Sequence, residues 1–324
     1  MGTTNQRIGI AVAGTLLVDN IYEISAYPAE GELTQIRAIK MAVGGLVPNN
    51  GIGLKKVAPQ MPIYAIGKIG ADGAGDFALK TLQNAGLDTT GIKVCGEEKT
   101  SFTDVMSIVG GQRTFFTYPG ASADFGYDDI PWDDLSCKML HLGYFLLLKK
   151  VDEGDGLRIL QEAIRRGIST SIDLVSENSD RYACVLPCLP YVDNLIVNEL
   201  EAGKMCEMEP TEENLPEMAK KLLSMGVRQR VIIHTPAIGL CATKDGTITS
   251  RPTCPLPKGF VKGKTGAGDA FCSGALIAIE RGARPEEILE LAEAVAVSSL
   301  TEANATDGIL CEEEALKRFR ALNA

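Results

Sequence analysis

Short runs of apolar residues alternate along the chain with longer stretches in which apolar residues recur every three or four positions. The short runs are rich in β-branched residues and predict strands, and the longer stretches predict helices. The predicted strands are Ile8–Ala13, Pro62–Ile66, Lys138–Leu142, Ser169–Asp173, Asn194–Val197 and Arg230–His234. The predicted helices are Val47–Val57, Gly73–Ala85, Gly154–Arg166, Thr211–Met225, Gly268–Arg281, Pro285–Thr301 and Glu312–Leu322. This alternation predicts an α/β fold in which helices cover a mostly parallel sheet.

Two stretches, Ile21–Lys40 and Thr100–Tyr118, depart from this alternation. Both are typical of antiparallel strands, and neither has a helix of its own. The second predicts a hairpin of Phe102–Val109 and Gln112–Tyr118 around the pair Gly110-Gly111. We interpret the two stretches as a small β-sheet that projects from the main domain as a lid over the site. Edge strands of the main sheet are the alternative.

The composition is that of an ordinary globular protein rather than of a nucleic-acid or membrane protein. The chain has 324 residues, 45% hydrophobic and 23% charged, without a linker or repeat, which is enough for one large α/β domain or two smaller ones. A formal net charge of −10 disfavours a nucleic-acid partner, because phosphate backbones are bound by basic patches. No apolar run approaches a membrane span or a secretory segment. Nine cysteines without CxxC spacing suit a reducing cytoplasm, and two histidines give little material for a His-based metal site or a Ser-His-Asp triad.

The strongest chemical pattern is the stretch Gly263-Lys-Thr-Gly-Ala-Gly-Asp-Ala-Phe271, which is followed at once by an apolar helical run. A glycine-rich turn that opens a helix presents free backbone N–H groups and the positive end of the helix dipole to one point, which suits a phosphate. A carboxylate beside such a turn repels phosphate. Asp269 is therefore better explained as a base that takes a proton from the group attacking the phosphate.

The glycine-rich segments have three other possible interpretations. A Walker A loop needs a glycine separated by four residues from the Gly-Lys pair, and that position holds Lys258. The segment Gly73–Ala78 matches a dinucleotide fingerprint, with Glu97 about twenty residues further on, but it follows the second predicted strand of the α/β pattern. A plain helix N-terminus explains the glycines of the later turn but not its lysine together with its carboxylate.

Five short motifs occur in order across nearly the whole chain. They are Gly14-Thr-Leu-Leu-Val-Asp19, Gly44-Gly-Leu-Val-Pro-Asn49, Gly67-Lys-Ile-Gly-Ala-Asp-Gly-Ala-Gly75, Asn198-Glu-Leu-Glu201 and Thr265-Gly-Ala-Gly-Asp-Ala-Phe271. Together they resemble the motifs of the PfkB-type carbohydrate kinases, the ribokinase-like family. The resemblance implies a three-layer α/β/α domain with a mostly parallel central sheet and a small β-sheet lid. It also implies that ATP and Mg²⁺ are used to phosphorylate a hydroxyl of a carbohydrate.

The resemblance assigns the transfer step to the last motif. Asp269 would be the general base that deprotonates the substrate hydroxyl. The amides of Gly266, Ala267 and Gly268 would form an anion hole for the charge on the transferring phosphoryl group. Glycine suits these positions because a side chain would keep the phosphate away from the backbone.

The resemblance places the sugar on the first two motifs. The expected substrate-binding residues are Asp19, Gly44, Gly45 and Asn49. The aspartate would accept hydrogen bonds from sugar hydroxyls, the glycines would let the backbone approach the sugar, and the asparagine would add a donor and an acceptor. From the residues alone, a capping aspartate, a tight turn and a polar residue at a helix start remain alternatives.

The nucleotide and its metal are assigned to residues in the second half of the chain. The expected cofactor-binding residues are Asn198, Lys264, Thr265, Gly239 and Asn304. In the family, an Asn-x-x-Glu pair such as Asn198 and Glu201 orders Mg²⁺ and its waters. A helix-capping asparagine beside a solvated glutamate is the alternative for this pair.

The chain departs from the family pattern at two places. Relatives usually carry Asp-Thr at the positions of Gly263 and Lys264, and that aspartate helps to bind a monovalent cation. We hypothesise that the Lys264 ammonium replaces the cation or contacts the phosphates, with a solvated surface lysine as the alternative. The family's Thr-x-Gly-x-x-Gly nucleotide turn is His234-Thr-Pro-Ala-Ile-Gly239 here, so ATP is the default donor.

The expected function is ATP-dependent phosphorylation of a small-molecule sugar. A nucleoside kinase of the same family and a catalytically silent sugar-binding regulator are the alternatives, and retention of Asp269 argues against the silent form. Substrate choice is expected to depend on positions of the β-sheet lid such as Thr103, Asp104, Met106 and Phe116. Because relatives' lids pair between subunits, a cytoplasmic homodimer is expected.

Overall fold

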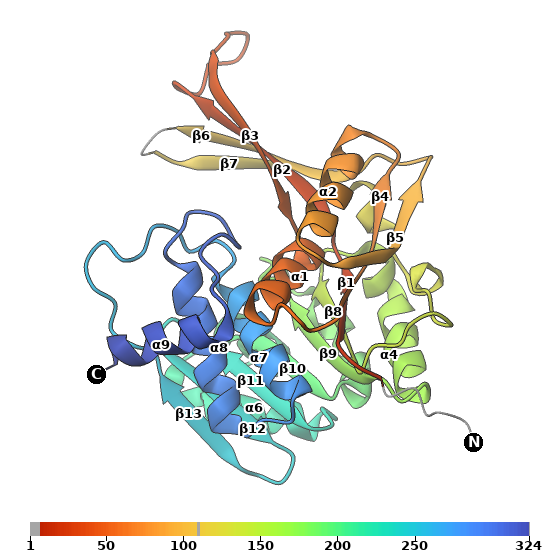
Figure 1. Cartoon of the computed structure of the whole chain (residues 1–324), viewed down its shortest axis with the longest axis vertical. Helices are drawn as coiled ribbons and strands as arrows, with labels where there is room; N and C mark the ends of the chain where they lie inside the picture. The colour runs from red at the N-terminus through yellow and green to blue at the C-terminus, as the bar shows by residue number, and fades with distance from the viewer. Residues whose placement is uncertain (1–6, 109–110, 324) are drawn as a thin grey trace.

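The computed structural model describes residues 7–108 and 111–323 (Figure 1). Its large sheet has nine strands in the order β13-β12-β11-β10-β9-β8-β1-β4-β5. The strands are β1 (Ile10–Gly14), β4 (Ile63–Gly70), β5 (Asp88–Cys95), β8 (Met139–Phe145), β9 (Ser169–Leu174), β10 (Asn194–Asn198), β11 (Arg230–His234), β12 (Ile238–Thr243) and β13 (Ile248–Pro252). All neighbouring pairs are parallel except β11–β12 and β12–β13. The predicted mostly parallel sheet is confirmed.

Helices cover both faces of this sheet and form two hydrophobic cores with it. On one face lie α1 (Leu46–Val57), α2 (Gly73–Asn84), α7 (Ala267–Glu280), α8 (Pro285–Ser299) and α9 (Glu312–Leu322). On the other lie α4 (Gly156–Arg165), α5 (Glu199–Cys206) and α6 (Leu215–Ser224). Shorter helical segments are α3 (Gly120–Ala123), a π-helical turn at Val151–Asp155 and 3₁₀ turns at Tyr127–Asp129, Arg181–Cys184, Leu186–Tyr191 and Glu212–Asn214. The result is a three-layer α/β/α arrangement.

The strand β1 shows why the sequence folds in this way. Its five residues, Ile-Ala-Val-Ala-Gly, are all buried, as expected for a central parallel strand covered by helices on both faces. The predicted strands and helices are all present, with ends that differ by a few residues. The sequence pattern missed β5, β12, β13 and α5. Strand β5 is at the sheet edge and largely exposed, and α5 has eight residues, so neither carries a long periodic pattern.

A second, separate sheet has the strand order β3-β2-β6-β7 and projects from the main body at the top of Figure 1. Its strands are β2 (Leu17–Ile24), β3 (Ile36–Gly44), β6 (Ser101–Ile108) and β7 (Arg113–Tyr118). The prediction of a small projecting sheet is confirmed, and the edge-strand alternative is wrong. The strands within each predicted stretch are antiparallel, as predicted, and the two stretches join through the parallel pair β2–β6. The β6–β7 hairpin is present, and its predicted residues Val109 and Gly110 lie outside the described part of the chain.

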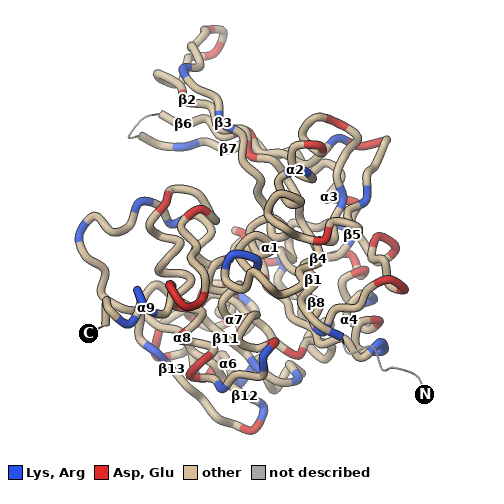
Figure 2. Tube along the Cα trace, in the orientation of Figure 1, with Lys and Arg blue, Asp and Glu red and all other residues tan. Residues whose placement is uncertain are grey.

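The charged residues are mixed over the molecule. Figure 2 shows Lys and Arg interspersed with Asp and Glu along the trace. Within residues 7–108 and 111–323, no helix is long and apolar enough to cross a membrane.

Candidate active site

The carboxyl ends of four neighbouring strands bring polar side chains to one edge of the large sheet. Tyr144, Asp173, Asn198 and His234 lie at or next to the ends of β8, β9, β10 and β11. Together with residues of the glycine-rich turn, they line a pocket of about 240 Å³. Other lining residues are Ser176, Glu201, Lys264, Gly266, Ala267, Gly268, Asp269 and Cys272. The topology therefore joins the predicted transfer turn to the Asn-x-x-Glu motif, at the edge where open α/β sheets bind ligands.

The glycine-rich turn opens α7. Gly266 caps the helix with φ +74°, and a Cβ atom placed on it would lie 2.4 Å from the Ala305 Cβ. The position therefore requires glycine for both its backbone conformation and its packing. The first N–H groups of the helix, including that of Gly268, have no acceptor one turn earlier within the helix. The Ala267 N–H lies 3.3 Å from the Lys264 carbonyl oxygen, so it already has a long hydrogen bond within the turn.

The Asp269 carboxylate is held by two neutral donors. The Tyr144 hydroxyl lies 2.9 Å from each carboxylate oxygen, and Asn49 Nδ2 donates to Oδ2 at 3.0 Å. Burial raises the pKa of Asp269 to about 7, and the nearby Asp173 adds to the rise, whereas the hydrogen bonds from Tyr144 and Asn49 oppose it. The side chain keeps partial solvent access, because it lies in the wall of the pocket. The carboxyl group is thus able to exchange a proton near neutral pH.

Tyr144 is a site residue that the sequence patterns missed. Its backbone has φ +60°, and its N–H donates to Asp173 Oδ1 at 2.8 Å. The close approach of Asp173 depends on Gly143, since a Cβ atom there would lie 2.2 Å from the same oxygen. Only their position in the sequence could have indicated Tyr144 and Asp173 as site residues, because both come at the ends of predicted parallel strands.

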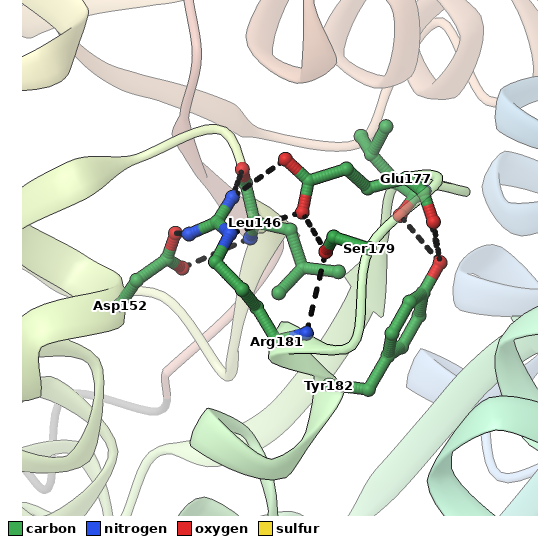
Figure 3. Close-up of polar contacts among 7 residues, drawn as sticks. Leu146, Asp152, Glu177, Ser179, Arg181 and Tyr182 are labelled. Atoms are coloured by element: carbon green, nitrogen blue, oxygen red, sulfur yellow. Dashed lines mark hydrogen bonds and ion pairs between the residues drawn. The ribbon is translucent and has the colours of Figure 1, made fainter.

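A polar network joins the loops that follow β8 and β9 (Figure 3). The Arg181 guanidinium donates to the Leu146 carbonyl oxygen at 2.6 Å and to Glu177 Oε1 at 2.8 Å, and it lies 3.3 Å from Asp152 Oδ2. Leu146 has φ +81°, so the network holds a loop whose backbone is strained. The network therefore ties the loop after β8 to the segment after β9.

The four expected substrate residues lie on the second sheet and on α1. Asp19 is in β2, and a Cβ atom on Gly44 of the adjacent β3 would lie 2.6 Å from its Oδ2. Burial raises the pKa of Asp19 to about 6. Gly45 begins α1 with φ +86°, and Asn49 in the first turns of that helix reaches Asp269. None of the four lines the 240 Å³ pocket. Asn49 nevertheless connects this group of residues to the transfer turn through its hydrogen bond to Asp269.

Asn198 and Glu201 form a reciprocal capping box at the start of α5. Asn198 Oδ1 accepts from the Glu201 N–H at 2.9 Å, and Glu201 Oε2 accepts from the Asn198 N–H at 3.0 Å. Ser176 Oγ donates to Glu201 Oε1 at 2.9 Å. Asn198 is therefore a helix cap, but Glu201 is not solvated, because it is 4% exposed and burial raises its pKa to about 7.

The packing around Gly263 explains why this chain has no aspartate at that position of the family pattern. A Cβ atom on Gly263 would lie 2.8 Å from the Ala303 Cα and 2.9 Å from the Glu302 carbonyl oxygen. An aspartate at this position would require the segment after α8 to move. Lys264 is exposed and lines the pocket, and the neighbouring Thr265 is exposed as well.

The other expected nucleotide residues are not brought into the pocket. Gly239 is a buried strand residue paired with His234, and Asn304 bonds to the Asp307 N–H and carboxylate within its own loop. His234 lines the pocket instead and stacks on Phe271, with ring centroids 4.8 Å apart. Burial lowers the pKa of His234 to about 4, so the imidazole is neutral at pH 7.

The structure also disfavours the interpretation of Gly73–Ala78 as a dinucleotide-binding turn. The segment opens α2, but the Asp72 carboxylate occupies the helix N-terminus and accepts from the Gly75 N–H at 2.9 Å. The same carboxylate accepts from the Thr100 hydroxyl at 2.7 Å. A phosphate would have to displace this capping carboxylate, so the segment is a structural helix start.

The fold and the pocket together define a class of protein. A carboxyl group at a helix start, beside free N–H groups at the carboxyl edge of a parallel sheet, suits phosphoryl transfer to an alcohol. The family model described as pfkB family carbohydrate kinase matches residues 9–310. The chain belongs to this family of phosphotransferases with alcohol acceptors.

Individual relatives agree with this assignment. Ribokinase from Arabidopsis thaliana is 25% identical over 293 residues, covering 89% of this chain and 74% of the relative. Adenosine kinase from Saccharomyces cerevisiae is 25% identical over 284 residues, covering 84% of this chain and 81% of the relative. The structure of Arabidopsis thaliana ribokinase complexed with ribose and ATP has a TM-score of 0.83 at 21% identity, and the match covers 97% of this chain and 99% of that one. The ribokinase-like fold is confirmed.

Proposed function

We propose that the protein transfers the γ-phosphoryl group of ATP to a hydroxyl of a small carbohydrate, with Asp269 as the general base. The observation that carries this proposal is the position of Asp269, one residue after Gly268 at the start of α7 and in the wall of the pocket. The base and the helix N–H groups are therefore close enough for one to act on the attacking hydroxyl and the others on the phosphoryl group. A pKa of about 7 for Asp269 suits a base that works near neutral pH.

Mg²⁺ would be ordered by Asn198 and Glu201 through water. Both Glu201 oxygens already accept hydrogen bonds from neutral donors, so direct coordination would cost these bonds. A buried carboxylate beside the pocket still attracts a hydrated divalent cation, and Mg²⁺ keeps several waters in most sites. The cation would neutralise charge on the nucleotide phosphates.

The second sheet would act as the lid of one kinase domain that spans residues 1–324, with the lid formed by about 21–40 and 100–118. Asp19 and Gly44 lie on this sheet, whereas Asp269 lies on the main body. Closure of the sheet over a sugar would bring the two sets together and exclude water from the transfer. We place the protein in the cytoplasm, which the free thiols of all nine cysteines support.

A nucleoside is the second candidate acceptor, because the similarity to the yeast adenosine kinase is as high as that to the plant ribokinase. An assay of ADP release over pentoses, hexoses, ketoses, sugar acids and nucleosides tests both acceptors. Turnover confined to sugars is the expected result. Turnover confined to nucleosides would establish the second candidate, and ATP-dependent turnover of none would contradict the proposed function.

Tyr144→Phe tests the control of the base. The substitution removes a hydrogen bond that stabilises the Asp269 carboxylate but keeps the ring that buries it, so the pKa of Asp269 should rise further. The deprotonated base is the active form, so the acidic limb of kcat/KM should move to higher pH. We expect a loss of about tenfold at pH 6, from the strength of hydrogen bonds to charged groups, and near-normal values at pH 9. An acidic limb that stays in place or moves to lower pH would contradict this role.

Lys264 leads to a prediction about monovalent cations. Because its ammonium can reach the pocket and Gly263 leaves no room for an aspartate, turnover should be equal within about twofold in K⁺ and Na⁺ buffers. Lys264→Gln should lower kcat/KM for ATP about tenfold. Lys262 is an exposed lysine near Glu302, so Lys262→Gln is the matched control and should have little effect on kcat/KM for ATP. Strong activation by K⁺ would overturn the idea.

We further propose a homodimer through the second sheet. Its edge strands expose large apolar side chains, including Ile39 at 64% and Phe115 at 62%. A second copy of the chain is the expected occupant, because two such edges can cover each other. Ile39→Glu should convert the dimer to a monomer in sedimentation experiments. Val94→Glu, at an exposed apolar position on the large sheet, is the control, and a wild-type monomer would contradict the proposal.

A further inference from the structure

Three buried metal-ligating side chains meet behind the pocket. They are His141 on β8, Asp173 on β9 and Cys272 on α7, and they are 0%, 7% and 2% exposed. One ligand atom from each lies within 4.8 Å of the other two. The proposed transfer step uses neither His141 nor Cys272, so the cluster needs an explanation of its own.

The spacing of the three groups fits that of ligands around one cation. His141 Nε2 lies 3.5 Å from Asp173 Oδ2 and also 3.5 Å from Cys272 Sγ. Hydrogen bonds of the N–H···O type are usually about 2.7–3.2 Å long, and one ring nitrogen carries either one proton or one lone pair. With bonds of about 2.0–2.3 Å in a tetrahedral site, ligand atoms lie roughly 3.3–3.7 Å apart. Both distances around Nε2 match a shared cation, and only the Cys272 distance also has the length of a sulfur hydrogen bond.

Surrounding groups orient the cluster in the way that metal sites need. His141 Nδ1 lies 3.1 Å from Ser171 Oγ, which leaves Nε2 directed at the other two ligands. Asp173 Oδ1 accepts the Tyr144 N–H at 2.8 Å, which leaves Oδ2 for a cation. Such outer contacts fix ligand orientation in known metal sites. Asp173 and Cys272 also line the 240 Å³ pocket, so a cation can enter from it and keep a water as its fourth ligand.

We propose that His141, Asp173 and Cys272 form a binding site for a thiophilic divalent cation of the Zn²⁺ class. An imidazole, a thiolate and a carboxylate are a donor set that favours such a cation over Mg²⁺. On binding, the Cys272 thiol transfers its proton to solvent as the metal–sulfur bond forms, and no electron is exchanged. The site is distinct from the Asn198–Glu201 pair, and its occupancy does not depend on the proposed kinase activity.

The site would affect the reaction because of where it is. Asp173 is one of the groups that raise the pKa of Asp269, and the Tyr144 N–H bonds to Asp173 while the Tyr144 hydroxyl bonds to Asp269. A cation bound to Asp173 would offset its negative charge and make Asp269 a weaker base. Occupancy of the site would therefore move the acidic limb of kcat/KM to lower pH, the opposite direction to Tyr144→Phe.

Cobalt titration of the full chain tests the site. Protein freed of metal by chelation should bind one equivalent of Co²⁺ with the charge-transfer absorption of a Co²⁺–thiolate bond, and Zn²⁺ should displace it. Cys272→Ser should lose the thiolate absorption, whereas Cys254→Ser, at another buried free thiol, should keep it. Ser171→Ala should weaken binding about 10–100-fold, the usual effect of losing an outer-shell partner. The absence of thiolate absorption in the wild type, or its persistence in Cys272→Ser, would overturn the proposal.

A measurement on the unmodified chain keeps the test decisive if a variant does not fold. Alkylation of the thiols under slowly unfolding conditions, followed by mass spectrometry, reports each cysteine separately. Zn²⁺ should protect Cys272 and leave Cys254 and Cys188 unchanged. Equal modification of Cys272 with and without Zn²⁺ would contradict the site even where the variants are uninformative.

Discussion

Asp269→Asn is expected to lower kcat by about 10²–10⁴-fold, the usual contribution of a general base. Asparagine has nearly the shape of aspartate, and its oxygen can still accept the hydrogen bond from the Tyr144 hydroxyl, so the pocket should keep its form. Asparagine cannot take the proton of the substrate hydroxyl. The loss should therefore appear in kcat from ADP release, while dissociation constants for acceptor and ATP from calorimetry stay within about threefold.

A matched control separates this effect from a general effect of lost charge. Asp245 lies in the turn between β12 and β13 and bonds only to residues of that turn. Asp245→Asn should therefore leave kcat unchanged. Near-normal kcat in Asp269→Asn would remove Asp269 from the role of base. Loss of acceptor or ATP binding in the same variant would instead give it a binding role.

The sequence indicates the glycine-rich turn at the start of α7 because the conformational requirements of that turn are local. Gly266 needs a positive φ and has no space for a side chain, and Asp269 must follow within the first helical turn, so the motif itself encodes the geometry. The alternation of apolar runs likewise predicted a mostly parallel sheet covered by helices. Parallel strands in a covered sheet must be apolar throughout, and this leaves a clear pattern.

The partners of Asp269 could not be predicted in the same way. Tyr144 and Asn49 are 125 and 220 residues away from it along the chain, and the topology of the sheet brings them together. Tyr144 also follows an apolar strand without any motif around it. The cluster of His141, Asp173 and Cys272 has the same origin, because its members belong to three separate elements.

Gly239, one of the expected nucleotide residues, has surroundings that the family pattern alone does not indicate. Gly239 matches the last glycine of the family's nucleotide turn, yet here it is buried beneath α8, where a Cβ atom would lie 2.9 Å from Glu293 Oε1. The segment between His234 and Gly239 contains Pro236, which has no N–H group to donate. The neighbouring His234, a departure from the pattern, is the residue that lines the pocket.

Gly266→Ala is expected to lower kcat about 100-fold, because it changes the start of α7. The new methyl group would lie 2.4 Å from the Ala305 Cβ, and two carbon atoms cannot approach so closely. The turn or the segment after α8 must move by about 1 Å, and a misplacement of this size costs roughly 10²-fold in rate. Steady-state kinetics of ADP release would measure the loss, and weaker ATP binding should accompany it.

Gly259→Ala separates the steric effect of this change from its backbone effect. Gly259 has φ +82°, close to the +74° of Gly266, but a Cβ atom on it would meet nothing within 4 Å. Both variants should lose about 1–2 kcal/mol of stability from a left-handed alanine, measurable by thermal unfolding. Only Gly266→Ala adds the collision with Ala305, so only it should lose activity in the folded state. Equal kcat in the two folded variants would show that the start of α7 does not position the reacting groups.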